Sequence, residues 1–149
     1  MASGTQEAAE TREAILLARG VCRLFGAMGH ACLTEVTVKN GRRADVLTMD
    51  GKGRFTIVEI KTSLADFRAD AKWGEYLEFC DRYYFAVPAH FPREVLPGEH
   101  GLIVADAWDA TILRASEEAP MHGTRRKAQT LLFAHLAARR LRQLVDPPV

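Results

Sequence analysis

The sequence contains few aromatic residues, few cysteines and no excess of charge of either sign. Aromatic side chains make up 8% of the 149 residues, and 20 Lys plus Arg oppose 19 Asp plus Glu, for a net charge of +1. A balanced charge excludes a protein that coats nucleic acid through bulk electrostatic attraction. The three cysteines Cys22, Cys32 and Cys80 form no C-x-x-C pair, which excludes a disulfide framework and a zinc ribbon.

Long apolar runs and targeting signals are also missing. The longest apolar runs, such as AILLA, are far too short to span a bilayer, and the opening MASGTQEAAETREA has no basic region followed by an apolar one. We therefore expect no membrane association and a cytoplasmic location. The 48% apolar content is enough for one globular domain over residues 1–149, with the small and polar residues 1–10 expected to be flexible.

Hydrophobic periodicity predicts a mixed α/β domain. Helical spacing begins at Thr11, which is a candidate cap, and Gly26 and Gly29 are expected to end this helix. Ser63, with Asp66 three residues later, has the spacing of a capping box before a second helix, which Gly74 could break or kink. The predicted order is helix 11–28, strands 33–38, 43–49 and 54–61, a helix after residue 63, strands 83–88 and 101–106, a short edge strand at 110–115, and helix 124–144. This order indicates a mixed sheet flanked by helices.

Two acidic residues are expected to face each other across the second hairpin. A three-residue loop, Gly51-Lys52-Gly53, sets Met49 opposite Phe55 and Leu47 opposite Ile57, which are apolar pairs. The same register sets Asp45 opposite Glu59, with Cβ atoms about 4.5–5.5 Å apart. Lys61 lies two residues beyond Glu59 and shares its face of the strand.

Such a pair of carboxylates implies a bound cation. Like charges at this separation destabilise each other unless a cation lies between them, and Mg²⁺ or Mn²⁺ with oxygen ligands is the usual solution. Lys61 would then stand beside the metal, where it could orient or deprotonate a water or stabilise charge on a phosphate. The alternative is a solvated hairpin end whose exposed ion pair contributes little.

These residues resemble a known family. Asp45 followed by Glu59-x-Lys61 on the next strand resembles the PD-(D/E)XK nuclease superfamily, which implies metal ligands at Asp45, Glu59 and the carbonyl of Ile60. The segments GRRADVL and VEIKTSLADFRADAKWGEYLEFCDRYYFAVP, with the basic C-terminal helix, resemble the MmcB-like DNA repair proteins. The resemblance covers about residues 11–145. It implies a restriction-endonuclease-like fold and a role in DNA repair, with DNA and DNA repair proteins as partners.

The resemblance has two departures. Ala44 stands where the superfamily pattern has proline, a common change that leaves the metal site intact. Lys72-x-x-x-Tyr76 resembles a Gln-x-x-x-Tyr element of RecB-like nucleases, with lysine in place of glutamine. The element implies contacts from Lys72 and Tyr76 to DNA, and Arg43 is a further candidate for the phosphate backbone.

Glu35 is a candidate additional metal ligand, because related proteins carry Glu here. A two-residue Asn40-Gly41 turn would pair Glu35 with Val46, away from Asp45, whereas a three-residue loop would bring it to the site.

Two functions follow from these residues. The first is a Mg²⁺- or Mn²⁺-dependent deoxyribonuclease that acts in DNA repair, with Asp45, Glu59 and Lys61 as its catalytic residues. The second is a catalytically silent nuclease-fold module that binds DNA or a repair partner. Retention of all three residues favours catalysis.

Overall fold

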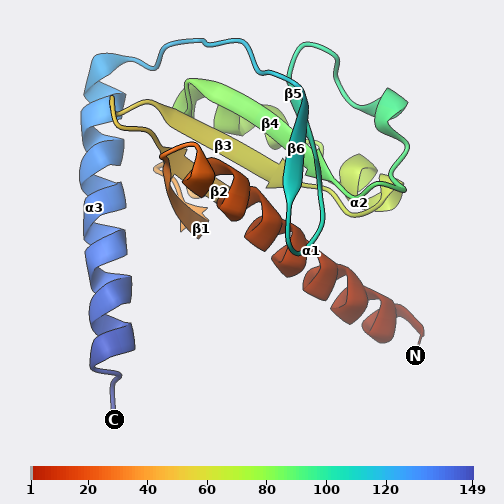
Figure 1. Cartoon of the computed structure of the whole chain (residues 1–149), viewed down its shortest axis with the longest axis horizontal. Coiled ribbons are helices and arrows are strands. Elements are labelled where there is room, and N and C mark those ends of the chain that lie inside the picture. The colour runs from red at the N-terminus through yellow and green to blue at the C-terminus, as the bar shows by residue number, and fades with distance from the viewer. Residues whose placement is uncertain (1) are drawn as a thin grey trace.

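The computed structural model describes residues 2–149 and forms one six-stranded sheet with helices on both faces (Figure 1). This confirms the predicted mixed α/β class. In chain order the elements are α1 (Ala2–Ala27), β1 (Ala31–Thr37), β2 (Arg43–Met49), β3 (Phe55–Ile60), α2 (Leu64–Ala69), the 3-10 helix η1 (Trp73–Phe79), β4 (Arg82–Val87), the 3-10 helix η2 (Arg93–Val95), β5 (Gly101–Ala105), β6 (Ala110–Arg114) and α3 (Gly123–Val145).

The strands lie in the sheet in the order in which they occur in the chain, from β1 to β6. β1, β2 and β3 form the predicted antiparallel meander, and β6 is an edge strand antiparallel to β5. β4 is parallel to both β3 and β5, so the chain must cross the sheet after β3. α2 and η1 form that crossover, and they place a helical layer beside the end of β3.

The two faces of the sheet carry separate hydrophobic clusters. On one face, Val21 and Phe25 of α1 pack against Val58 of β3 and Ile103 of β5. On the other face, η1 and α3 pack on the sheet, with Phe133 of α3 in the same cluster as residues of β2 and β3. Successive side chains of β3 point to opposite faces of the sheet, and all six of its residues are buried. Both faces of this central strand are therefore covered. None of the helices within residues 2–149 combines the length and the apolar character that a membrane span needs.

The first helix is longer than predicted. α1 begins at Ala2, so the expectations that it begins at Thr11 and that residues 2–10 lie outside it are wrong. Glu, Gln and Ala dominate this segment and are good helix formers, and Gln6 donates a side-chain hydrogen bond to Glu10 one turn later. The predicted end is confirmed: Gly29 has a positive φ of 88°, and the N–H of His30 bonds back to Phe25 O. Met1 lies outside the described residues.

The helix predicted after Ser63 is divided in two. The capping interaction is confirmed, since the N–H of Asp66 donates to Ser63 Oγ at 3.1 Å and Asp66 Oδ2 accepts from the N–H of Thr62 at 3.0 Å. α2 nevertheless ends at Ala69, before Gly74, so the break lies upstream of the glycine. There Asp70 Oδ1 accepts from the N–H of Lys72, a local turn that competes with continued helix.

A buried carboxylate joins the sheet to α3. The side chain of Asp81, which is 0% exposed, accepts hydrogen bonds from the N–H groups of Phe55 and Met121 and forms an ion pair with Arg126 of α3. Arg126 also donates to Gly53 O at 2.9 Å. Burial by itself raises the pKa of Asp81, but the bonds from Arg126 and the two N–H groups outweigh it and hold the pKa below its ordinary value of 3.8.

We expect Asp81→Ala to lower the free energy of unfolding by about 3 kcal/mol at neutral pH, because it leaves the partly buried Arg126 and two buried N–H groups without their acceptor. A carboxyl whose folded-state pKa is depressed stabilises the fold above about pH 4, and this contribution is lost as the pH falls through the folded-state pKa. Urea denaturation at neutral and acidic pH measures both effects, so the variant should also lose stability less steeply in acid. Asp146→Ala, which removes an exposed partner of Arg142, is the control and should change little; an equal loss in both variants would contradict the prediction.

Candidate functional site

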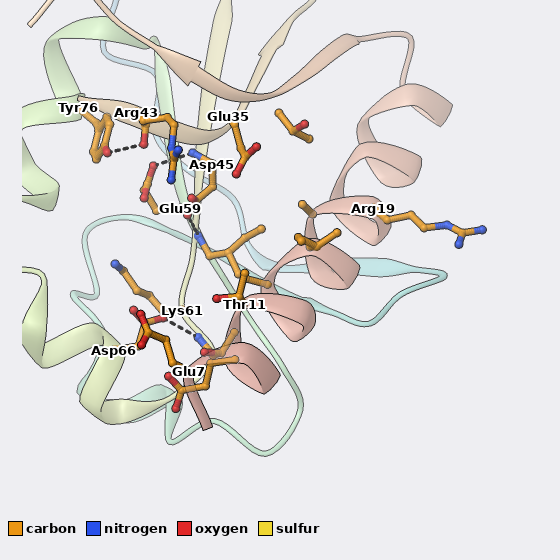
Figure 2. Close-up of a pocket in the computed structure, with 17 residues that line it drawn as sticks. Glu7, Thr11, Arg19, Glu35, Arg43, Asp45, Glu59, Lys61, Asp66 and Tyr76 are labelled. Carbon is orange, nitrogen blue, oxygen red and sulfur yellow. Dashed lines mark hydrogen bonds between the residues drawn. The ribbon is translucent and has the colours of Figure 1, made fainter. Parts of the chain in front are cut away.

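A cavity of about 730 Å³ opens at one end of the sheet, between α1 and the ends of β2 and β3. Figure 2 shows Asp45, Glu59 and Lys61 on one side of this space, with Glu7 and Thr11 of α1 opposite. The sheet thus supplies the floor of the cavity and the first half of α1 supplies a wall.

The predicted register brings Asp45 and Glu59 together. Met49 pairs with Phe55 and Leu47 with Ile57, as the three-residue loop requires, and backbone pairing of β2 with β3 ends at Val46 and Val58. Beyond these residues, the N–H of Asp45 donates to Glu59 Oε1 at 3.2 Å, and the N–H of Ile60 donates to Asp45 Oδ2 at 2.8 Å. The two carboxylates therefore meet between strands that begin to separate.

Burial perturbs both carboxyl groups, and the charge of Asp45 adds to its effect on Glu59. Glu59 is 4% exposed. Burial raises its pKa well above the ordinary value of 4.5, and the charge of Asp45 raises it further. Burial also raises the pKa of Asp45, against the bond from the Ile60 N–H and the charge of Lys61. A pair in this state favours either a shared proton or a bound cation.

Lys61 lies just beyond the end of β3 and is 5% exposed. Its Nζ donates to Asp70 Oδ2 at 2.7 Å, so the closest partner of this ammonium is Asp70 and neither carboxylate of the acidic pair. Although burial raises the pKa of Asp70, the bond from Lys61 holds it below its ordinary value. Asp70 thereby fixes the position of the lysine beside the cavity.

Glu35 lines the same cavity, on β1. Thr34 pairs with Val46 and Val36 with Ala44, the register of the three-residue alternative, which sets Glu35 opposite Asp45. Glu35 has a φ of 50°, the one positive value for a non-glycine residue among residues 2–149. The guanidinium of Arg140, on α3, donates to Thr34 O at 2.6 Å and to Glu35 O at 2.8 Å, which holds the strand in this left-handed conformation.

The predicted DNA contacts are placed unequally. Arg43 lines the cavity and is exposed. Tyr76 also lines it, but its hydroxyl donates to Arg43 O at 2.7 Å and so supports the start of β2. Lys72 is not among the residues that line the cavity; it lies at the start of η1, where its N–H bonds to Asp70.

Two parts of the site were not predicted from the sequence. The sequence does not place Asp70 at the site, because the capping pattern around residue 66 carries no signal of the bond from Lys61 to Asp70. The helix predicted to begin at Thr11 also excludes Glu7 and Glu10, which contribute to the cavity wall. The helix-forming composition of residues 5–10 was a signal that could have extended α1.

The donor chemistry fits a hydrated divalent ion. No group of three or more His, Cys, Asp or Glu side chains within residues 2–149 is assembled as a metal site. Two adjacent carboxylates are nevertheless a suitable set for Mg²⁺, which usually keeps several waters and binds through one or two carboxylates and the phosphates of its substrate. Asp45 and Glu59 each use one oxygen for a backbone N–H and retain a second.

The fold and the cavity define a class of protein: a mixed α/β domain whose sheet ends in an acidic pair, one member buried and one half-buried, beside a fixed lysine. The family model for the DNA repair protein MmcB-like family matches residues 2–148, so the chain belongs to the MmcB-like family of DNA repair proteins. A solved structure described as SPO1766, a protein of unknown function from Silicibacter pomeroyi, is similar: 49% identity, 88% of this chain and 90% of that chain covered, and a TM-score of 0.86. No curated protein matches the chain.

The left-handed backbone of Glu35 generates a test of strain. We expect Glu35→Gly to leave the free energy of unfolding unchanged or to raise it by up to about 1 kcal/mol, because glycine adopts this conformation freely. Thr37→Gly in the same strand is the matched control, and it should lower stability by about 0.5–1 kcal/mol. Urea denaturation measures both, and an equal loss in the two variants would show that Glu35 is not strained.

The repulsion between the carboxylates generates a second test. In chelator and at mildly alkaline pH, we expect Glu59→Gln to raise the melting temperature by about 2–4 °C for each kcal/mol of repulsion that the neutral amide removes. Glu7→Gln removes the same charge from the exposed wall of the cavity and should shift the melting temperature little. A melting temperature unchanged by Glu59→Gln would mean that the carboxylates are already relieved by a proton or by their surroundings.

Proposed function

We propose that the protein is a Mg²⁺- or Mn²⁺-dependent deoxyribonuclease of the PD-(D/E)XK type, which hydrolyses phosphodiester bonds during DNA repair. The observation that carries the proposal is the pair of the half-buried Asp45 and the buried Glu59, with Lys61 at the same cavity. Membership of a DNA repair family supports DNA as the substrate. The three cysteines are free thiols, which supports a location in the reducing cytoplasm.

Asp45, Glu59 and the carbonyl of Ile60 would hold the ion. A divalent cation there supplies charge neutralisation on the phosphate and lowers the pKa of a nearby water. The chain's own contribution is to bring two carboxylates together before any ion arrives, because backbone N–H groups fix one oxygen of each. Such preorganisation avoids rearrangement of charged groups during the reaction.

Lys61 supplies a positive charge held beside the acidic pair. Its bond to Asp70 restricts the long side chain, so the ammonium is available to orient the attacking water or to stabilise charge that develops on the phosphate. Asp70 acts through Lys61 and is a positioning residue.

The rim of the cavity would contact the DNA backbone. Arg43 is exposed at the rim, next to Asp45, and can neutralise a phosphate. Tyr76 stabilises the chain at Arg43 through its hydroxyl. Lys72 lies outside the cavity lining, where a flanking phosphate could reach it. Binding that weakens with added salt follows from these contacts.

The test is cleavage of single-stranded, duplex, nicked and branched DNA with Mg²⁺ or Mn²⁺. We expect Asp45→Asn and Lys61→Met each to reduce the cleavage rate at least about 100-fold, because each removes a group that acts on the developing charge. Lys52→Met, in the exposed turn between β2 and β3, is the matched control and should keep the wild-type rate. Undiminished cleavage by both site variants would exclude the proposed site.

Calorimetry separates the competing function. Wild-type protein should bind Mn²⁺, and Glu59→Ala should abolish this binding, because it removes one of the two carboxylate ligands. Binding of DNA and Mn²⁺ without cleavage of any substrate would instead support a catalytically silent DNA-binding module.

A further inference from the structure

An exposed tryptophan lies at the tip of the β5–β6 hairpin. The side chain of Trp108 is 63% exposed, the largest exposed fraction of any aromatic residue in the described chain. The guanidinium carbons of Arg19 and Arg23 lie 4.4 Å and 5.3 Å from its ring centroid. These arginines are four residues apart on α1 and therefore share one face of that helix.

Hydrogen bonds order the turn that carries Trp108. Asp106 Oδ1 accepts hydrogen bonds from the N–H groups of Trp108 and Asp109, both at 2.8 Å. Gly20 lets the turn approach α1 closely, because a Cβ at this position would lie 2.0 Å from Asp106 O. Figure 1 shows the tip of the hairpin against the middle of α1. The turn and the helix are thus already joined without a contribution from the indole.

The environment of Trp108 suits an unpaired nucleotide. Both arginines reach the ring from α1, and Trp108 nevertheless remains 63% exposed, so much of the indole stays accessible from solvent. An open indole face stacks on a nucleobase of any sequence, and adjacent guanidinium groups neutralise the flanking phosphates. A base-paired duplex offers no free base face for this contact.

The tryptophan is connected to the acidic cavity. Arg19 is one of the residues that line the cavity. Figure 2 shows its side chain directed away from Asp45 and Glu59, outward from α1. Arg19 therefore contributes to the cavity rim and, through its guanidinium, to the surface around Trp108.

We propose that Trp108, Arg19 and Arg23 form a binding site for single-stranded DNA, in which a base stacks on Trp108 and the arginines contact its phosphates. This inference rests on the proposed function, since it gives the substrate a single-stranded segment next to the site of cleavage. It does not depend on metal chemistry and is measured in chelator.

The experiment measures binding of oligo(dT) of about 16 nucleotides, and of a blunt duplex of the same length, by fluorescence anisotropy in chelator. Wild-type protein should prefer oligo(dT). Trp108→Ala should weaken oligo(dT) binding about 5- to 150-fold, the effect of one lost base stack, while Trp108→Phe should retain most of the affinity. Leu113→Ala, which truncates another exposed apolar side chain of the same hairpin, is the matched control and should bind as wild type.

Two further readouts separate stacking from a structural role. The protein has two tryptophans, so oligo(dT) should quench the fluorescence of wild type but not that of Trp108→Phe, in which Trp73 alone remains. The double change Arg19→Gln with Arg23→Gln should reduce the slope of log affinity against log salt by about 1.4, because each of the two lost phosphate contacts contributes about 0.7.

The outcomes distinguish this proposal from the proposed nuclease function. Wild-type affinity of Trp108→Ala for oligo(dT) would overturn the single-strand site, even if the protein cleaves DNA. Absence of oligo(dT) binding by wild type would also overturn it. Trp108-dependent binding in a protein that cleaves nothing would support the site and refute only the nuclease.

Discussion

The central constraint of this structure is a pair of carboxylates, each of which accepts a backbone N–H group from the strand of the other. Backbone pairing of β2 with β3 stops at Val46 and Val58. Beyond that point Glu59 accepts the N–H of Asp45 and Asp45 accepts the N–H of Ile60, so side chains continue the bonding where the backbones separate. The opening between the strands therefore holds one buried and one half-buried carboxylate, a combination that is unfavourable without a cation or a proton.

The surrounding elements keep the pair from being neutralised by the protein itself. Lys61 is close enough to influence both carboxylates, yet Asp70 takes its hydrogen bond. Arg140 likewise donates a hydrogen bond to the backbone carbonyl of Glu35 in β1, and Glu35 lines the cavity. Lys61 and Arg140 thus donate their hydrogen bonds to other groups, and the acidic side chains at the cavity remain available for a ligand.

This division of roles agrees with a DNA repair family and with a substrate whose negative charge requires positive groups at the rim. Arg43 provides one such group beside the acidic pair, whereas Arg19 and Arg23 provide positive charge around Trp108, along α1. A single-stranded segment would satisfy both the rim and the open face of Trp108. The net charge alone would not have indicated such a binding surface, because it is only +1.

The sequence by itself determined the order of helices and strands along the chain, the register of the hairpin around Gly51–Gly53 and the meeting of Asp45 with Glu59. It could do so because turn residues and apolar alternation act between neighbours in the chain. The loop before β2 had two registers compatible with its residues, and packing selected the one that sets Glu35 opposite Asp45. Only the tertiary structure decided that Asp70 bonds to Lys61 and that Arg140 bonds to the backbone of β1. It also decided that α1 forms the cavity wall and carries the arginines that lie over Trp108. These contacts depend on how helices dock on the sheet, and no local pattern encodes the distance between residues that meet from separate elements.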